Sequence, residues 1–184
     1  MANEAQTPVT EKTDLKAQLA EVAERIRTMR EIIGLSEEEM AIYENIRTRT
    51  LSGLQSEKIN PIEALMALTK LRQAACSPEL IDKHLTIPSS KIRVFLELVS
   101  ELKENKHRAL VFSQFTSFLA LVRQALDKAG IEYLYLDGSV PAAQRKKLVE
   151  TFQNGDMPLF LISLKAGGTG LNLTAADYVI HLDP

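Results

Sequence analysis

The sequence has no tryptophan, and tyrosine and phenylalanine together make up only 5% of its 184 residues. Its apolar content comes mainly from leucine, alanine and isoleucine, and at 45% of the chain it is sufficient for a buried core. Strands that pack sheet against sheet are usually rich in aromatic and β-branched residues. The composition therefore argues against a β-sandwich and favours helices packed on a sheet, an α/β class.

Cysteine, net charge and long apolar runs are also scarce. The single cysteine, Cys76, excludes an internal disulfide framework and a cysteine-rich zinc site, and it suits a reducing compartment. The formal net charge of −2 would not attract a polyanion to the whole molecule, so any nucleic-acid contact must be local. Three scattered histidines show no metal-ligand spacing, so we predict no metal site. No run is long enough for a membrane span and the polar start lacks a signal-peptide core, so we expect an intracellular protein without a membrane partner.

The first 84 residues are predicted to be helical. Residues 1–13 are polar and are expected to be a disordered or vector-derived tail. Between residues 14 and 84, apolar positions recur at helical spacing. Ser36 and Glu39 have the spacing of a capping box, which predicts a helix start. The first apolar stripe contains Leu15, Leu19, Val22, Ile26 and Ile33. This stripe suits packing within the chain, and it also suits docking onto a partner or self-association.

Residues 85–184 alternate between apolar runs of strand length and amphipathic segments of helix length. Strands buried on both faces read as unbroken apolar runs, so this alternation predicts a parallel sheet covered by helices on both sides. Ligands of such sheets bind beyond the carboxyl ends of the strands. That rule places Ser113 and Gln114, residues 137–139 and residues 163–170 on one rim.

The segment "KAGGTGLN", residues 165–172, suggests an anion site or a tight turn. It is not a Walker A loop, because Leu171 and Asn172 stand where a lysine and a hydroxyl residue are required. It also has no glycine at the offset that the third glycine of a dinucleotide fingerprint occupies. Glycines after a strand nevertheless let backbone amides approach an anion, and Lys165 adds a positive charge.

Two further polar groups near this rim have a functional and a structural interpretation. Arg145, Lys146 and Lys147 suit phosphate binding near a helix N-terminus, and they equally suit a solvated helix face. Ser113 and Gln114 can bond a sugar-phosphate backbone without reading bases, or they can simply cap the end of a strand.

Three segments in order, "ALVFSQFTSFL", "YLYLDGSVPAAQRKKLVETFQNG" and "LFLISLKAGGTGLNLTAADYVIHLDP", resemble motifs four, four-a and five of Swi/Snf-type ATP-dependent DNA translocases, a branch of helicase superfamily two. The resemblance extends back through "LSEEEMAIYENIR" and covers roughly residues 35–184. It implies a RecA-like second lobe at residues 85–184 that follows a helical region at 14–84.

The resemblance also implies roles for single residues. Those expected on or near the DNA-backbone surface are Ser113, Gln114, Arg145, Ser163, Lys165 and Gly167. Those expected toward the nucleotide cleft are Gly168, Gly170, Leu171 and Asn172. The implied partners are duplex DNA and a first RecA-like lobe, and the implied location is the bacterial cytoplasm with its nucleoid or the eukaryotic nucleus.

The sequence departs from the family pattern in ways that affect catalysis. It contains no Walker A loop and no acidic magnesium box, and it stops before the arginines of motif six. We therefore expect a truncated lobe with no complete catalytic set, whose parent uses ATP and magnesium while the isolated chain binds neither tightly. Truncation is also expected to uncover apolar surface for self-association. The alternatives are a small stand-alone nucleotide-binding α/β protein and a non-catalytic helical interaction module.

Overall fold

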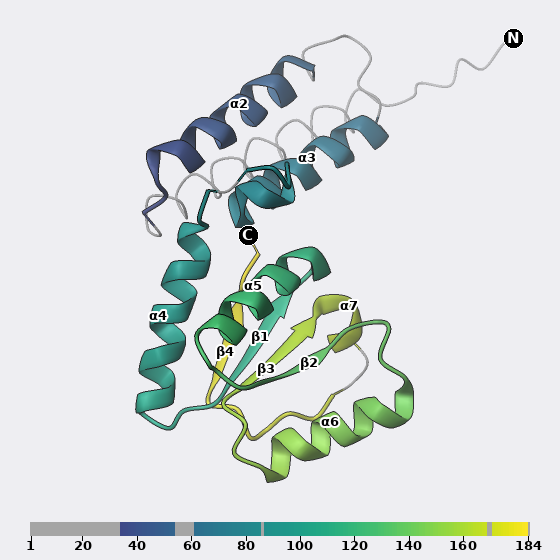
Figure 1. Cartoon of the computed structure of the whole chain (residues 1–184). Coiled ribbons are helices and arrows are strands. Elements are labelled where there is room, and N and C mark those ends of the chain that lie inside the picture. Colours follow the sequence, from purple (N-terminus) through teal and green to yellow (C-terminus); the bar gives the residue numbers. More distant parts are fainter. Residues whose placement is uncertain (1–33, 54–60, 86, 169–170, 184) are drawn as a thin grey trace, which may run out of the picture.

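The computed structural model describes residues 34–53, 61–85, 87–168 and 171–183. They form a helical pair followed by a four-stranded sheet with helices on both faces (Figure 1), which confirms the predicted α/β class. The predicted tail at 1–13 and the apolar stripe that ends at Ile33 lie outside the described residues. Within the described part, no helix combines the length and the apolar character needed to cross a bilayer.

The helical pair consists of α2 (Glu37–Gly53) and α3 (Pro61–Cys76), which pack against each other. The capping box is present: the Glu39 amide donates to Ser36 Oγ at 3.2 Å, and the Ser36 amide donates to Glu39 Oε2 at 3.0 Å. A small core joins the two helices and contains Tyr43, Leu71, Ala74 and Ala75. A single 3-10 turn, η1 (Pro78–Leu80), then leads toward the sheet.

The sheet is parallel throughout, with the strand order β2-β3-β1-β4. Its strands are β1 (Ala109–Ser113), β2 (Tyr133–Leu136), β3 (Leu159–Ser163) and β4 (Tyr178–His181). The longer helices of this region are α4 (Ser90–Glu104), α5 (Thr116–Lys128) and α6 (Ala142–Asn154). These strands and longer helices alternate as the sequence pattern predicts, because long apolar runs and helical periodicity are both strong signals.

Successive side chains of each strand point to opposite faces of the sheet, so they pack in two separate cores. Val111 and Leu161 face the core shared with α4 and α5, whereas Phe160 and Ile162 face the core shared with α6. The central strand β3 is buried at all five positions, as expected for a strand covered on both sides. The edge strand β4 is more open, with Tyr178 46% and Val179 59% exposed.

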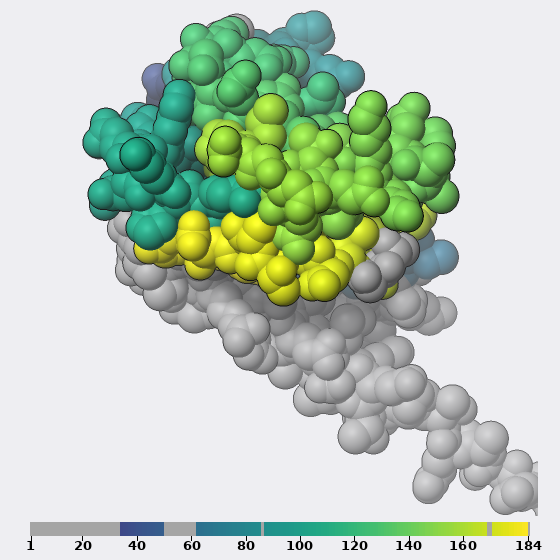
Figure 2. All heavy atoms as spheres, turned by 90° about the horizontal axis from the view of Figure 1, so that it is seen from below, coloured from purple at the N-terminus to yellow at the C-terminus, as the bar shows by residue number. Residues whose placement is uncertain are grey.

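Residues 171–177 run along the lower end of the lobe toward β4. Figure 2 shows them as a yellow band along the border of the teal and green parts of the lobe. Gln153 of α6 holds this segment, donating to the Thr174 hydroxyl at 3.0 Å and accepting from the Ala175 amide at 2.8 Å. The Arg108 amide then donates to Asp177 Oδ2 at 2.8 Å and is the main reason why the pKa of Asp177 lies below its ordinary value. These contacts fix the path of the chain into β4.

Candidate nucleic-acid interface

The carboxyl ends of β1, β2 and β3 meet at one edge of the sheet, which we call the rim. Ser113 and Ser163 are paired neighbours in the register of β1 and β3, and Leu136 pairs with Ile162 one step earlier. The segments that begin at Gln114, Asp137 and Leu164 therefore leave the sheet side by side. This confirms their predicted position at one edge, since all neighbouring strands are parallel.

At the first of these strand ends, Ser113 is fully buried and Gln114 is exposed. The Ser113 hydroxyl donates to Asp183 Oδ1 at 2.6 Å, and the Gln114 amide donates to Asp183 Oδ2. The Phe115 amide donates to Ser113 Oγ at 3.0 Å. This is the strand-end capping that the sequence left open as an alternative. A phosphate contact by the Ser113 hydroxyl would require its bond to Asp183 to open, whereas the Gln114 side chain already reaches solvent.

At the end of β3 the structure has a helical turn, α7 (Leu164–Gly167), where the sequence analysis expects a glycine loop. Ser163 is buried, and its hydroxyl accepts a bond from the Ala166 amide at 3.4 Å, which caps this turn. Ala166 is also buried. Lys165 points outward and is exposed. The Ser163 hydroxyl thus has a local structural role, and the exposed charge at this point of the rim is that of Lys165.

The glycines of this segment differ in their surroundings. A Cβ atom on Gly167 would lie 3.0 Å from Phe112 Cε1 and 3.4 Å from Ile162 Cγ2, so the missing side chain lets α7 approach the sheet closely. Gly168 is exposed, and its amide donates to the Leu164 carbonyl at 3.3 Å. Gly170 lies outside the described residues. Leu171 packs half-buried against the core on the α6 side, and Asn172 is exposed.

Arg145 closes the loop between β2 and α6. Its Nε donates to the Val140 carbonyl at 2.7 Å, and its Nη2 lies 3.4 Å from the Asp137 carbonyl and 3.3 Å from that of Gly138. The guanidinium therefore binds backbone at the rim. Its neighbours Lys146 and Lys147 are exposed, as a solvated helix face requires. Lys146 lies 3.8 Å from Glu150, a surface pair of little energetic weight.

Asp137 organises the same loop. Its Oδ1 accepts from the Ser139 hydroxyl at 2.6 Å and from the Ser139 amide at 2.9 Å, and its Oδ2 accepts from the Tyr135 hydroxyl at 2.8 Å. The Ser139 hydroxyl is the main reason why the pKa of Asp137 lies below its ordinary value. Burial, followed by the bond to Asp137, raises the pKa of Tyr135 to about 12. The loop is thus held in one shape at neutral pH.

Three residues near the rim were not among the predicted site residues: Asp183, Arg72 and Lys91. Asp183 lies beside β1 because β4 pairs with β1, and that strand order could not be read from the sequence. The guanidinium carbon of Arg72, on α3, lies 5.8 Å from the centroid of the Phe115 ring. Lys91 is buried, and its ammonium group donates to the Leu182 carbonyl at 3.0 Å. Motif order alone contains no signal for such contacts between distant segments.

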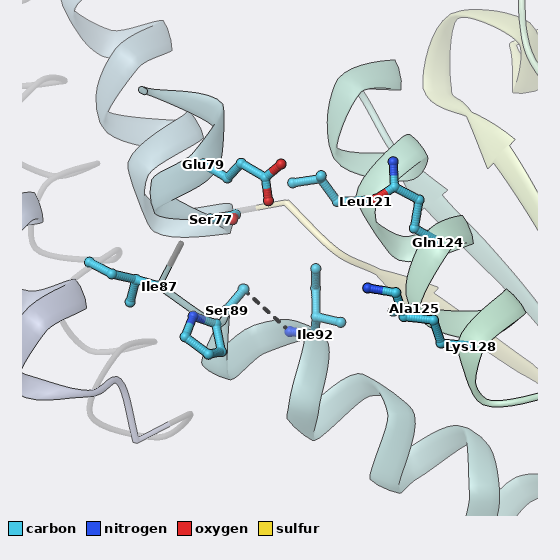
Figure 3. A pocket seen from close by; sticks show the side chains of 10 residues that line it. Ser77, Glu79, Ile87, Ser89, Ile92, Leu121, Gln124, Ala125 and Lys128 are labelled. Carbon is cyan, nitrogen blue, oxygen red and sulfur yellow. Dashed lines mark hydrogen bonds between the residues drawn. The ribbon is translucent and has the colours of Figure 1, made fainter. Parts of the chain in front are cut away.

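A separate cavity of about 210 Å³ lies where η1, the segment before α4, and α5 meet. Figure 3 shows Leu121, Gln124 and Lys128 of α5 on one side and Ser77 and Glu79 on the other. None of its lining residues belongs to the predicted DNA or nucleotide set. Within the described ranges, no group of histidine, cysteine and carboxylate side chains is arranged to hold a metal ion.

A parallel sheet with helices on both faces and polar residues at its carboxyl edge is a doubly wound α/β lobe, and its match to a SWI2/SNF2 ATPase C-terminal domain identifies it as RecA-like. The family model of the helicase conserved C-terminal domain matches residues 90–184, just over half of the chain. The chain therefore belongs to this family, and within it to the Swi/Snf type that the motifs resemble.

Relatives and solved structures agree with this assignment. The chain is 34% identical over 177 residues to chromodomain-helicase-DNA-binding protein 1-like of Danio rerio, a match that covers 89% of this chain and 17% of that protein. It superimposes on the Sulfolobus solfataricus SWI2/SNF2 ATPase C-terminal domain with a TM-score of 0.70 and 26% identity, covering 80% of this chain and 68% of that one. The core of that ATPase in complex with double-stranded DNA gives a TM-score of 0.66 and 25% identity, with 80% and 33% covered. The chain thus spans about a sixth of the length of the curated relative.

Proposed function

We propose that this chain is the second RecA-like lobe of an ATP-driven motor that moves along duplex DNA and remodels protein-DNA complexes, and that its rim binds the phosphates of the DNA backbone. The observation that carries the proposal is the exposed Lys165, which lies on the helical turn α7 capped by Ser163, next to the exposed Gln114. A cation on a rigid turn holds its position while a phosphate approaches. The likeness to a SWI2/SNF2 ATPase core that was solved with double-stranded DNA supports the choice of ligand.

The residues of the rim divide into contacting and positioning groups. Lys165 and Gln114 supply exposed polar groups for the phosphate backbone. Ser113, Ser163 and Arg145 hold the strand ends and the β2 loop through hydrogen bonds within the chain. Gly167 lets α7 lie close to the sheet. Because backbone contacts carry no sequence information, binding should be insensitive to DNA sequence and should weaken with salt.

Lys165→Ala tests this assignment. We expect its affinity for a short DNA duplex to fall roughly three- to tenfold, and the slope of log K against log salt to become shallower by about 1, since one phosphate contact is lost. Fluorescence anisotropy across a salt series measures both quantities. The matched control is Lys128→Ala, which removes an exposed lysine from the far end of α5 and should change neither. Equal effects of the two variants would contradict a phosphate contact at Lys165.

We also propose that ATP and magnesium bind between this lobe and a first lobe, with Gly168, Gly170, Leu171 and Asn172 toward the nucleotide. Phosphoryl transfer needs a lysine, a magnesium site and usually an arginine placed around the γ-phosphate. The sequence has neither a Walker A lysine nor an acidic magnesium box. The purified chain is therefore expected to release no phosphate from ATP above background, with or without duplex DNA. DNA-stimulated phosphate release from this chain would contradict that.

We also propose surfaces through which the chain self-associates or contacts a neighbouring lobe, and a location in the cell. Exposed apolar side chains at Tyr178 and Val179 on the edge strand, and at Leu65 and Met66 on α3, supply surface for contact with a second copy or a neighbouring lobe. We place the protein with its DNA, in the bacterial cytoplasm or the eukaryotic nucleus. The motor assignment is favoured over a stand-alone nucleotide-binding protein because family and structural matches both cover the sheet and its rim.

A further inference from the structure

Asp183 accepts hydrogen bonds from three donors that lie on two separate segments. Its Oδ1 accepts from the Ser113 hydroxyl at 2.6 Å and lies 3.8 Å from the Cys76 sulfur, whose thiol donates to it. Its Oδ2 accepts from the backbone amide of Gln114. Two of these donors belong to the end of β1, and the third belongs to the end of α3. One carboxylate therefore joins the helical pair to the predicted DNA-binding edge.

The position of Asp183 is itself fixed by its neighbours. The Leu182 amide donates to the Phe112 carbonyl at 2.9 Å, which extends the pairing of β4 with β1 by one residue. The buried ammonium group of Lys91 donates to the Leu182 carbonyl at 3.0 Å, and the Leu182 side chain is buried. The carboxylate is thus presented from an anchored backbone.

The thiol that faces Asp183 is a donor at neutral pH. Burial above all, partly countered by Lys91 and reinforced by the carboxylate, raises the pKa of Cys76 to about 12. The thiol therefore stays protonated and donates a hydrogen bond to the carboxylate oxygen. A thiol is a weak hydrogen-bond donor, so at 3.8 Å this contact is weaker than the two bonds from the end of β1.

The negative charge of Asp183 is compatible with a role in positioning other residues but not with attraction of DNA. A carboxylate next to a surface that binds phosphates repels the ligand through space, so Asp183 adds nothing to DNA affinity by its charge. Its hydrogen bonds instead fix the Gln114 backbone and thereby the direction of the exposed Gln114 side chain. Restraining a contacting group before binding lowers the entropy lost on binding.

We propose that Asp183 is a positioning residue of the DNA-binding edge, which holds Gln114 in its binding orientation and ties it to α3 through Cys76. This inference rests on the proposed function. Asp183→Asn keeps the size of the side chain but replaces one acceptor oxygen with a donor that faces the Gln114 amide or the Ser113 hydroxyl. The variant is therefore expected to bind duplex DNA about tenfold more weakly, although it carries one negative charge fewer.

The test combines two measurements on the full 184-residue chain. Amide hydrogen exchange of Gln114 in the DNA-free protein should become at least tenfold faster in Asp183→Asn. Anisotropy with a DNA duplex, on protein verified as folded, should show the affinity loss with an unchanged salt slope, because no cation is removed. The control Asp156→Asn removes the same charge from an exposed site at the opposite end of the lobe and should leave both readouts within twofold of the wild type.

Ser113→Ala keeps the inference testable if Asp183→Asn does not fold. It removes one of the bonds to the carboxylate, so Gln114 exchange should again accelerate in the absence of DNA, whereas a serine that only contacts phosphate would leave that exchange unchanged. Asp183→Asn that binds DNA as tightly as the wild type, or more tightly, overturns the inference, as does unchanged Gln114 exchange in both variants. Wild-type protein that binds no duplex contradicts the proposed function instead, and Gln114 exchange then decides the positioning role by itself.

Discussion

Phe160→Ala is expected to lower the free energy of unfolding by about 3–5 kcal/mol, the usual cost of removing a buried aromatic ring. Phe160, the second residue of β3, is completely buried, and its ring centroid lies 5.4 Å from that of Phe152 on α6. Alanine at this position would leave a cavity between the sheet and α6. Because whole domains are stable by only about 5–15 kcal/mol, the loss should be a large fraction of the total. Urea unfolding followed by circular dichroism measures it.

The control for this variant is Tyr178→Ala on the edge strand. Tyr178 is aromatic and lies on a strand of the same sheet, but it is 46% exposed. Its truncation should cost clearly less than half of the loss in Phe160→Ala, because less surface returns to water. Similar losses in the two variants would contradict the idea that β3 and α6 share a tightly packed core.

The strands were predictable because a strand that is buried on both faces of a sheet has an almost unbroken apolar sequence. "LFLIS" is apolar at four of its five positions, and the structure buries all five residues of β3. The capping box at Ser36 was predictable for a similar reason, since both of its hydrogen bonds join residues three positions apart. Local rules describe what nearby residues do to one another, and for these elements nearby residues decide the outcome.

At the rim, the pattern of neighbouring residues was not sufficient to predict which side chains are exposed. The pattern "SLKAGG" suggested exposed amides in a glycine loop, but Ser163 caps a helical turn there and Gly167 packs against Phe112. The sequence left Ser113 open as a contact to a sugar-phosphate backbone or as a strand-end cap, and in the structure it is buried under Asp183. The Ser163 cap joins residues close in sequence, whereas the contacts of Gly167 with Phe112 and of Ser113 with Asp183 join segments far apart in the chain. The motif order identified the correct edge of the sheet, and only the register and strand order reveal which of its side chains reach solvent.

Glu39 is a further case of a residue whose second role depends on tertiary structure. Besides closing the capping box of α2, its carboxylate accepts from the Ser90 amide at 2.9 Å and from the Ser90 hydroxyl. Ser90 is the first residue of α4, so one buried side chain caps two helices at once. The neighbouring Ser89 hydroxyl donates to the Cys76 carbonyl at 2.9 Å, next to the same junction. The helical pair is therefore joined to the RecA-like lobe by buried polar contacts.

Glu39→Ala is accordingly expected to lower the free energy of unfolding by roughly 3 kcal/mol, since hydrogen bonds to a charged group are lost and buried donors at Ser90 remain without an acceptor. The control Glu38→Ala removes an exposed carboxylate from the same helical turn, with the same change in charge and helix-dipole interaction. Its loss should be less than a third as large. Urea unfolding gives both values, and amide exchange at Ser90 should accelerate only in Glu39→Ala. If the two variants behaved alike, the first turn of α2 would be stabilised by its charge alone, and the junction between the helical pair and the lobe would have to depend on its apolar contacts.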